Sequence, residues 1–255
     1  MARRIVPRRL GHDEEASLVD HLTELRHRLV ICIVAIVPAF AVAYVFHDEL
    51  IERLKDLLPP GTPLVTLGVT EPFTTSLKVS FYAALAIVLP LLLWQIWAFL
   101  APAVAEDTQR VIGVFVVLST GLFLAGLVFC YTVVLPRALE FLVDYDSELY
   151  LEQIRASYYL SFVTLTLFAF GIAFQMPIFI LGLVRLGVLT SDRLRHNRRI
   201  GYVLMLTFAI LLPTVDPVSL ALEVVPLFVL FEASIWLSVF MERRWERSAA
   251  EAEAL

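Results

Sequence analysis

Charged residues and the residues of common catalytic sites are scarce in this 255-residue sequence. Only 18% of the residues are charged, and 59% are hydrophobic. Soluble globular domains are roughly 45–50% apolar, so an ordinary water-soluble enzyme is excluded. A net charge of −5 is too small to keep so apolar a chain unfolded, which excludes intrinsic disorder. The acidic balance also argues against a nucleic-acid partner, because it offers phosphates no overall positive field.

No histidine lies within an apolar run, which excludes an H-E-x-x-H zinc helix or a histidine-activated serine inside a membrane span. The only lysines, Lys55 and Lys78, each follow a leucine, so the sequence has no phosphate-binding loop with Gly-Lys before Ser or Thr. Cys32 and Cys130 lie inside apolar runs and are interpreted as small buried side chains. The sequence therefore predicts no enzymatic activity, no cofactor and no metal site.

Long uncharged runs dominate what is present. The six apolar runs are 29–46, 79–105, 111–136, 156–184, 200–213 and 218–241. A membrane-spanning helix needs about 20 residues, and the first four runs are long enough. The fifth run would reach only about 21 Å as a helix, and Glu223, Pro226 and Glu232 interrupt the sixth. We expect an all-α polytopic membrane protein with six transmembrane helices, the last two of them short. The last pair forms either two short spans in a locally thinned bilayer or a re-entrant hairpin.

Lysine and arginine are distributed unequally between the two sets of loops. Fifteen lie in the N-terminal segment, in the loops around Arg110 and Arg193, and in the C-terminal tail, and five lie on the other side. The positive-inside rule then predicts that both termini are cytoplasmic. We expect a cytoplasmic N-terminal segment at 1–28, one membrane domain at 29–241 and a cytoplasmic tail at 242–255.

The segment 17–28 carries leucines at helical spacing on one face and Asp20, Glu24, His27 and Arg28 on the other. This pattern predicts an amphipathic helix in the headgroup zone that turns into the first span. The charged face is open to two interpretations, a solvated interfacial anchor or a binding surface. Glu24 and Arg28 are spaced as an i, i+4 ion pair.

Gln175 is the conspicuous polar residue within the fourth run, and Pro177 two residues later predicts a kink. A buried amide needs a hydrogen-bond partner, so Gln175 either joins two helices of this chain or binds a foreign polar residue. Glu223, Glu232 and Asp216 are the acidic residues near the membrane. They either reach the interface or mark an ion pathway.

Residues 21–29, H-L-T-E-L-R-H-R-L, resemble the H-L-x-E-L-R-x-R-L motif of the TatC family, the receptor subunit of the twin-arginine protein translocase. Further blocks follow in the family's order, and the resemblance covers about residues 17–241. These blocks are Glu71-Pro72-Phe73 with Lys78, then Pro90, Gln95-Ile96-Trp97-Ala98-Phe99 and Ala101-Pro102, and then Gly171, Phe174, Pro177 and the turn 213–216.

The resemblance implies a protein of the bacterial or archaeal cytoplasmic membrane that binds twin-arginine signal peptides of folded cargo. It also implies single-span partner subunits of the TatA and TatB type, assembled in an oligomeric complex in the lipid bilayer. The residues matched to signal-peptide binding are Glu24, Leu29, Phe99 and Pro102. The family's second glutamate falls at Thr108 here, and the neighbouring Glu106 and Asp107 are candidates to supply its charge.

For partner docking the resemblance implies Gln175, where many relatives have glutamate, together with Phe174 and Asp216. Arg26 and Arg28 are assigned to lipid phosphate or to orienting Glu24, because a positive charge repels a signal arginine. The alternative is a secondary transporter of a small solute that uses Gln175, Glu223 and Glu232. It would usually carry an internal repeat.

Overall fold

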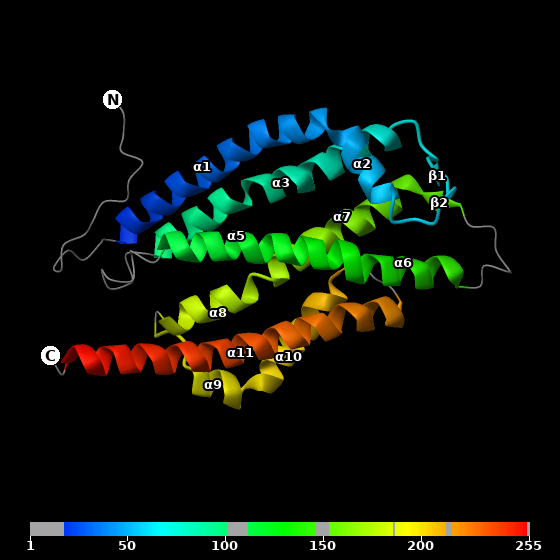
Figure 1. Cartoon of the computed structure of the whole chain (residues 1–255). Helices are drawn as coiled ribbons and strands as arrows, with labels where there is room; N and C mark the ends of the chain where they lie inside the picture. The colour runs from blue at the N-terminus through cyan, green and yellow to red at the C-terminus, as the bar shows by residue number, and fades with distance from the viewer. Residues whose placement is uncertain (1–17, 101–111, 146–152, 186, 213–215, 254–255) are drawn as a thin grey trace, which may run out of the picture.

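The computed structural model describes residues 18–100, 112–145, 153–185, 187–212 and 216–253. In these ranges the chain is mostly helical, as the apolar runs predict (Figure 1). The described part also contains one element that the sequence did not predict, a two-stranded parallel pairing. Strand β1 (Leu64–Val65) pairs with β2 (Ile154–Arg155), so the segment between the first two apolar runs contacts the segment between the third and fourth.

Helix α1 (Leu18–Val45) is continuous through Arg28, so the expected turn between an interfacial helix and the first span is wrong. Neither glycine nor proline occurs in α1 before Pro38, so nothing in this stretch breaks the helix. The predicted boundary at 28 thus falls within a helix. The boundary at 241 likewise falls within α11 (Pro217–Glu253), and the division into segments stays a prediction.

The third apolar run continues further than predicted. Helix α5 (Ile112–Phe129), the π-helical segment η2 (Cys130–Val134) and α6 (Leu135–Asp144) follow without a gap. Pro136 does not end the helix, although it lies in the first turn of α6, directly after the π-helical segment η2. Residues 137–144, which lie beyond the predicted end of the third run, are therefore helical.

The fourth run divides into α7 (Ala156–Ala173) and α8 (Met176–Arg185). The break lies at Phe174 and Gln175, just before Pro177, which confirms the predicted kink. A proline at this position has no N–H to donate to the carbonyl four residues earlier.

The last two long helices differ from each other in length. Helix α9 (Ser191–His196) precedes α10 (Arg198–Ile210), which has 13 residues and is short, as predicted. Helix α11 has 37 residues, so the prediction that it is short was wrong. Glu223 is only 1% exposed within the protein, so it does not end the helix at an interface. Five helical segments in the described chain are long and apolar enough to cross a membrane, and α10 is not among them.

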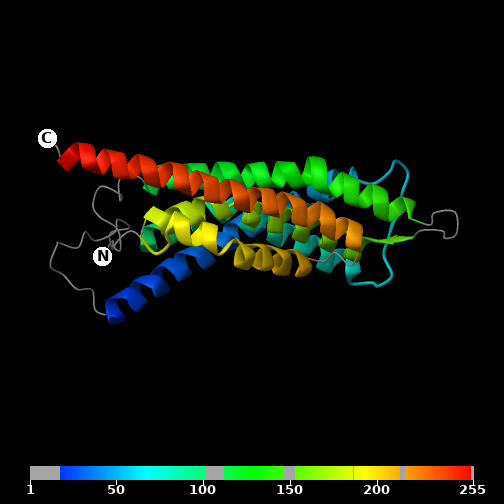
Figure 2. The ribbon, with the colours of Figure 1, turned by 90° about the horizontal axis from the view of Figure 1, so that it is seen from below.

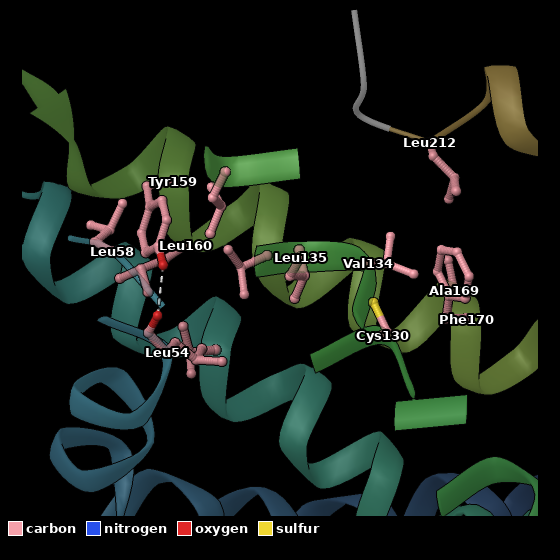
Figure 3. Packing of buried hydrophobic residues seen from close by; sticks show 13 residues of the cluster. Leu54, Leu58, Cys130, Val134, Leu135, Tyr159, Leu160, Ala169, Phe170 and Leu212 are labelled. Carbon is pink, nitrogen blue, oxygen red and sulfur yellow. Dashed lines mark hydrogen bonds between the residues drawn. The ribbon is translucent and has the colours of Figure 1, made fainter. Parts of the chain in front are cut away.

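The start of α1 and the end of α11 lie at one end of the molecule (Figures 1 and 2). Helix α2 (His47–Lys55), the two strands and the end of α6 lie at the other end. Helix α3 (Glu71–Leu100) packs against α1, α5 and α7, while α11 packs against α8 and α10. Apolar side chains from α2, η2, α6 and α7 meet in a buried cluster, in which the Tyr159 hydroxyl donates to the Leu54 carbonyl at 2.6 Å (Figure 3).

Glu71, the first residue of α3, ties this strand-bearing end together. Its Oε2 accepts from the backbone N–H groups of Leu67 (2.9 Å) and Gly68 (3.2 Å). Its Oε1 accepts from Arg155 Nε (3.0 Å) and from the N–H of Ser157 (3.2 Å). The hydrogen bond to Glu71 raises the pKa of Arg155 above its ordinary value. One carboxylate thereby connects the starts of α3 and α7, next to the paired strands.

Gly126 lies where the backbone of α5 closely approaches the end of α7. A Cβ at this position would lie 2.8 Å from the carbonyl oxygen of Phe170 and 2.9 Å from the Cβ of Phe174. A backbone oxygen cannot move aside as a flexible side chain does. Close packing of the two helices therefore requires glycine here.

We predict that Gly126→Ala lowers the free energy of unfolding by about 1–3 kcal/mol, the usual cost of overpacking. Gly121 on the same helix is the matched control, since a Cβ there meets no atom within 4 Å. Gly121→Ala should be neutral or stabilising, because alanine has the higher helix propensity. Unfolding in detergent micelles measures both variants, and equal stabilities would contradict the close approach.

Candidate functional sites

The first candidate site joins α1 to α3 near the end of the molecule where α1 begins. Arg28 donates from Nε to Glu24 Oε1 at 3.0 Å, and its Nη2 donates to the same oxygen. Across the helix interface, Arg28 Nη1 donates to Gln95 Oε1 at 3.0 Å and Nη2 donates to the Ala98 carbonyl at 3.1 Å. The i, i+4 pair that the sequence predicted is therefore also a cross-link between two helices.

Burial differs between the two partners of this ion pair. The Arg28 side chain is 12% exposed and that of Glu24 is 33% exposed. Arg28 is thus held inside the interface, while Glu24 remains accessible at its edge. A carboxylate in this position can still accept hydrogen bonds from a ligand.

Gln95 belongs to this candidate site, although reasoning from the sequence did not assign it there. It is 8% exposed on α3 and accepts from Arg28, which lies 67 positions earlier. Its signal in the sequence was weak, a single amide inside an apolar run. The Ala98 carbonyl lies in the last turn of α3, where carbonyls lack helical partners and attract cations.

The other residues expected in this site differ in exposure, and some of them lie outside the described residues. Leu29 is exposed on α1 and Phe99 is half-buried at the end of α3, next to Ala98. Arg26 is exposed and, unlike Arg28, is not part of the cross-link to Gln95 and Ala98. Pro102, Glu106 and Asp107, together with Thr108, lie outside the described residues.

The second candidate site is centred on Gln175, at the break between α7 and α8. Gln175 is 4% exposed, and its Nε2 donates to the Ser119 carbonyl of α5 at 3.0 Å. Its Oε1 is buried without a hydrogen-bond partner among the described residues. Gln175 lines a cavity of about 550 Å³, whose other walls are apolar side chains of α3, α7, α8 and α10. The site therefore combines an apolar groove with one unused buried acceptor.

The two residues grouped with Gln175 in the sequence have separate surroundings. Phe174 packs its ring against Phe129, with 5.7 Å between the ring centroids. Asp216 precedes α11, and its Oδ1 accepts from the N–H of Ser219 at 2.7 Å, which caps that helix. Neither is among the described residues that line the cavity.

The carboxylates of the alternative transporter hypothesis do not join Gln175. Glu232 accepts from the Tyr202 hydroxyl, and its Oε2 lies 3.4 Å from Arg198 Nη1. Glu223 is buried on α11, and neither glutamate lines the Gln175 cavity in the part of the chain that the structure describes. Within those same ranges no three His, Cys, Asp or Glu residues are grouped to hold a metal ion.

Comparison with known proteins identifies relatives over most of the chain. The family model of the Sec-independent protein translocase protein TatC matches residues 20–226. The TatC protein of Deinococcus radiodurans is 35% identical over 232 residues, which cover 88% of this chain and 86% of that protein. The TatC protein of Escherichia coli K12 is 33% identical over 234 residues, or 89% of this chain and 90% of that one.

A solved structure agrees with these matches. A crystal structure of the twin-arginine translocase receptor TatC in DDM superposes with a TM-score of 0.80 at 34% identity. It covers 86% of this chain and 99% of that one. The family match, the two relatives and the shared fold together establish that this chain belongs to the TatC family of Sec-independent protein translocase proteins.

Proposed function

We propose that this component of a Sec-independent translocase binds twin-arginine signal peptides at Glu24 and gathers single-span partner subunits around Gln175. In this proposal the end of the molecule that carries Glu24 faces the cytoplasm. The excess of arginine in the segments that lead to this end supports that orientation. Both sites lie on a non-enzymatic transport protein with several membrane-spanning helices.

The observation that carries the signal-peptide proposal is the carboxylate of Glu24, accessible at the edge of the α1–α3 interface. A guanidinium group binds a carboxylate through two parallel hydrogen bonds, a geometry that an ammonium group cannot reproduce. Leu29 and Phe99 provide apolar surface nearby for the segment that follows the arginines. In the proposal, Pro102 and either Glu106 or Asp107, from the part of the sequence that follows α3, complete the site.

The docking proposal rests on the amide of Gln175. A neutral amide in an apolar cavity can accept one hydrogen bond from a polar residue of a neighbouring transmembrane helix. We keep Phe174, which precedes Gln175, and Asp216, which precedes α11, as further docking residues outside the cavity. We assign Arg26 to lipid phosphate, because it is exposed on the same helix as Glu24.

We predict that Glu24→Ala weakens binding of a synthetic leader peptide with two consecutive arginines by about tenfold to a hundredfold. A hydrogen bond to a charged group contributes about 1.5–3 kcal/mol, which converts to that range. Fluorescence anisotropy with the purified full chain measures the change. Glu52→Ala is the matched control, since Glu52 is an exposed glutamate on α2 at the opposite end. Undiminished binding by Glu24→Ala would remove Glu24 from the site.

We also predict that Gln175→Leu weakens co-purification with a single-span partner by about threefold to thirtyfold and leaves peptide binding intact. Interhelical hydrogen bonds of this kind contribute about 0.6–2 kcal/mol. Thr166→Val is the matched control, because Thr166 is a fully buried polar residue on α7 that does not line the cavity. Loss of folded protein with Gln175→Leu would instead indicate a purely structural amide.

A further inference from the structure

The guanidinium group of Arg28 is bound on more than one side, which an ordinary surface ion pair does not require. Two of its nitrogens donate to Glu24 Oε1, while Gln95 Oε1 and the Ala98 carbonyl accept from it on the α3 side. Arg28 and Gln95 are 12% and 8% exposed. These contacts fix the position of Arg28 from both helices.

Arg28 contacts only one of the two carboxylate oxygens of Glu24. Both bonds from Arg28 go to Oε1 of Glu24, so Arg28 does not engage Oε2. A carboxylate has enough lone pairs to accept from separate donors at its two oxygens. Because Oε2 keeps its own two lone pairs, an incoming guanidinium can donate two N–H groups to Oε2, as Arg28 does to Oε1, without displacing Arg28.

We propose that Arg28 and Gln95 are positioning residues for Glu24, which together turn Oε2 of its carboxylate toward the signal peptide. This inference rests on the proposed function. Arg28 holds Oε1 against α3, and Gln95 holds Arg28. The Glu24 side chain then has a fixed rotamer before the ligand binds. Its conformational entropy is lost when the protein folds, so binding does not carry that cost.

The two acceptors on α3, Gln95 and the Ala98 carbonyl, are chemically suited to fix the position of Arg28. Gln95 is neutral, so it satisfies Nη1 without drawing the guanidinium away from Glu24. The final carbonyls of α3 attract a cation through the helix dipole and add a second neutral acceptor. A lysine at position 28 would lack the planar fork that reaches Glu24, Gln95 and Ala98 together.

Orientation of the Glu24 carboxylate should affect leader peptides with two arginines differently from leader peptides with two lysines. A planar guanidinium that donates two N–H groups to Oε2 needs this oxygen in a defined orientation, whereas an ammonium binds as a point charge from many directions. Loss of positioning should therefore weaken binding of a two-arginine leader more than that of a two-lysine leader. The arginine-over-lysine preference distinguishes positioning from a general effect on folding or charge.

The first test is Arg28→Gln in the purified full chain, titrated with synthetic leaders that carry two arginines or two lysines. Arg26→Gln removes the same charge from the exposed side of the same helix, and the effect of Arg28→Gln is read relative to it. We expect about tenfold weaker binding of the two-arginine leader, comparable to the rotamer freedom that Glu24 regains. The preference over the two-lysine leader should fall as well.

The opposite result has a clear meaning. If Arg28 instead competed with the signal arginine for Glu24, its removal would strengthen binding of the two-arginine leader. Stronger binding or an unchanged preference would overturn the inference. Failure of the unaltered chain to prefer two arginines would instead overturn the proposed function, so the two failures are distinguishable.

The second test is Gln95→Leu, which keeps the volume of the side chain and removes the acceptor. It should lower the same affinity and preference in the same direction. Gln153→Leu, the same substitution at an exposed glutamine, is the comparison variant. In the Arg28→Gln/Gln95→Leu double variant the second change should add nothing, because Gln95 acts through Arg28. Fully additive effects would contradict that order, and thermal unfolding of each variant reports any loss of folded protein.

Discussion

The contact on which the α1–α3 site depends is the guanidinium of Arg28, held between two helices. A cation at 12% exposure is costly unless its N–H groups find acceptors, and here α1 and α3 each supply them. The need to satisfy Arg28 therefore fixes the relative positions of α1 and the end of α3. It also fixes Glu24, the residue to which we assign signal recognition. The need of one buried guanidinium for hydrogen-bond acceptors thus determines both the packing of α1 on α3 and the geometry of the site.

The parts of the fold that could be predicted from the sequence follow from length and backbone chemistry. The fifth run forms the short helix α10, and Pro177 breaks the fourth helix where it should. The expected turn before the first span and the expected shortness of α11 were wrong for one reason, because charged residues were taken to end or interrupt a helix. Arg28 lies within continuous α1, and buried Glu223 lies within α11. Sequence composition does not reveal whether a charge is exposed or enclosed by its neighbours.

The candidate sites also contain contacts that the sequence predicts and contacts that it does not. Glu24 and Arg28 are four residues apart on one helix, so their pairing follows from helix geometry alone. Gln95 approaches Arg28 only through the packing of α3 on α1, which no local pattern encodes. Gln175 was conspicuous as an amide in an apolar run, but the cavity beside it is formed by four helices. Local chemistry is visible in a sequence, whereas contacts between distant segments require the fold.

Under the proposed function the two sites bind their partners through different interactions. Glu24 is charged and partly exposed, so its attraction for arginine weakens as salt screens the charges. Gln175 is neutral and 4% exposed in an apolar groove, where ionic strength has little effect on a hydrogen bond. A cargo leader with two positive charges has no electrostatic reason to occupy Gln175, and an apolar partner helix has none to occupy Glu24. The chain therefore keeps capture of cargo and assembly of partners from competing for one surface.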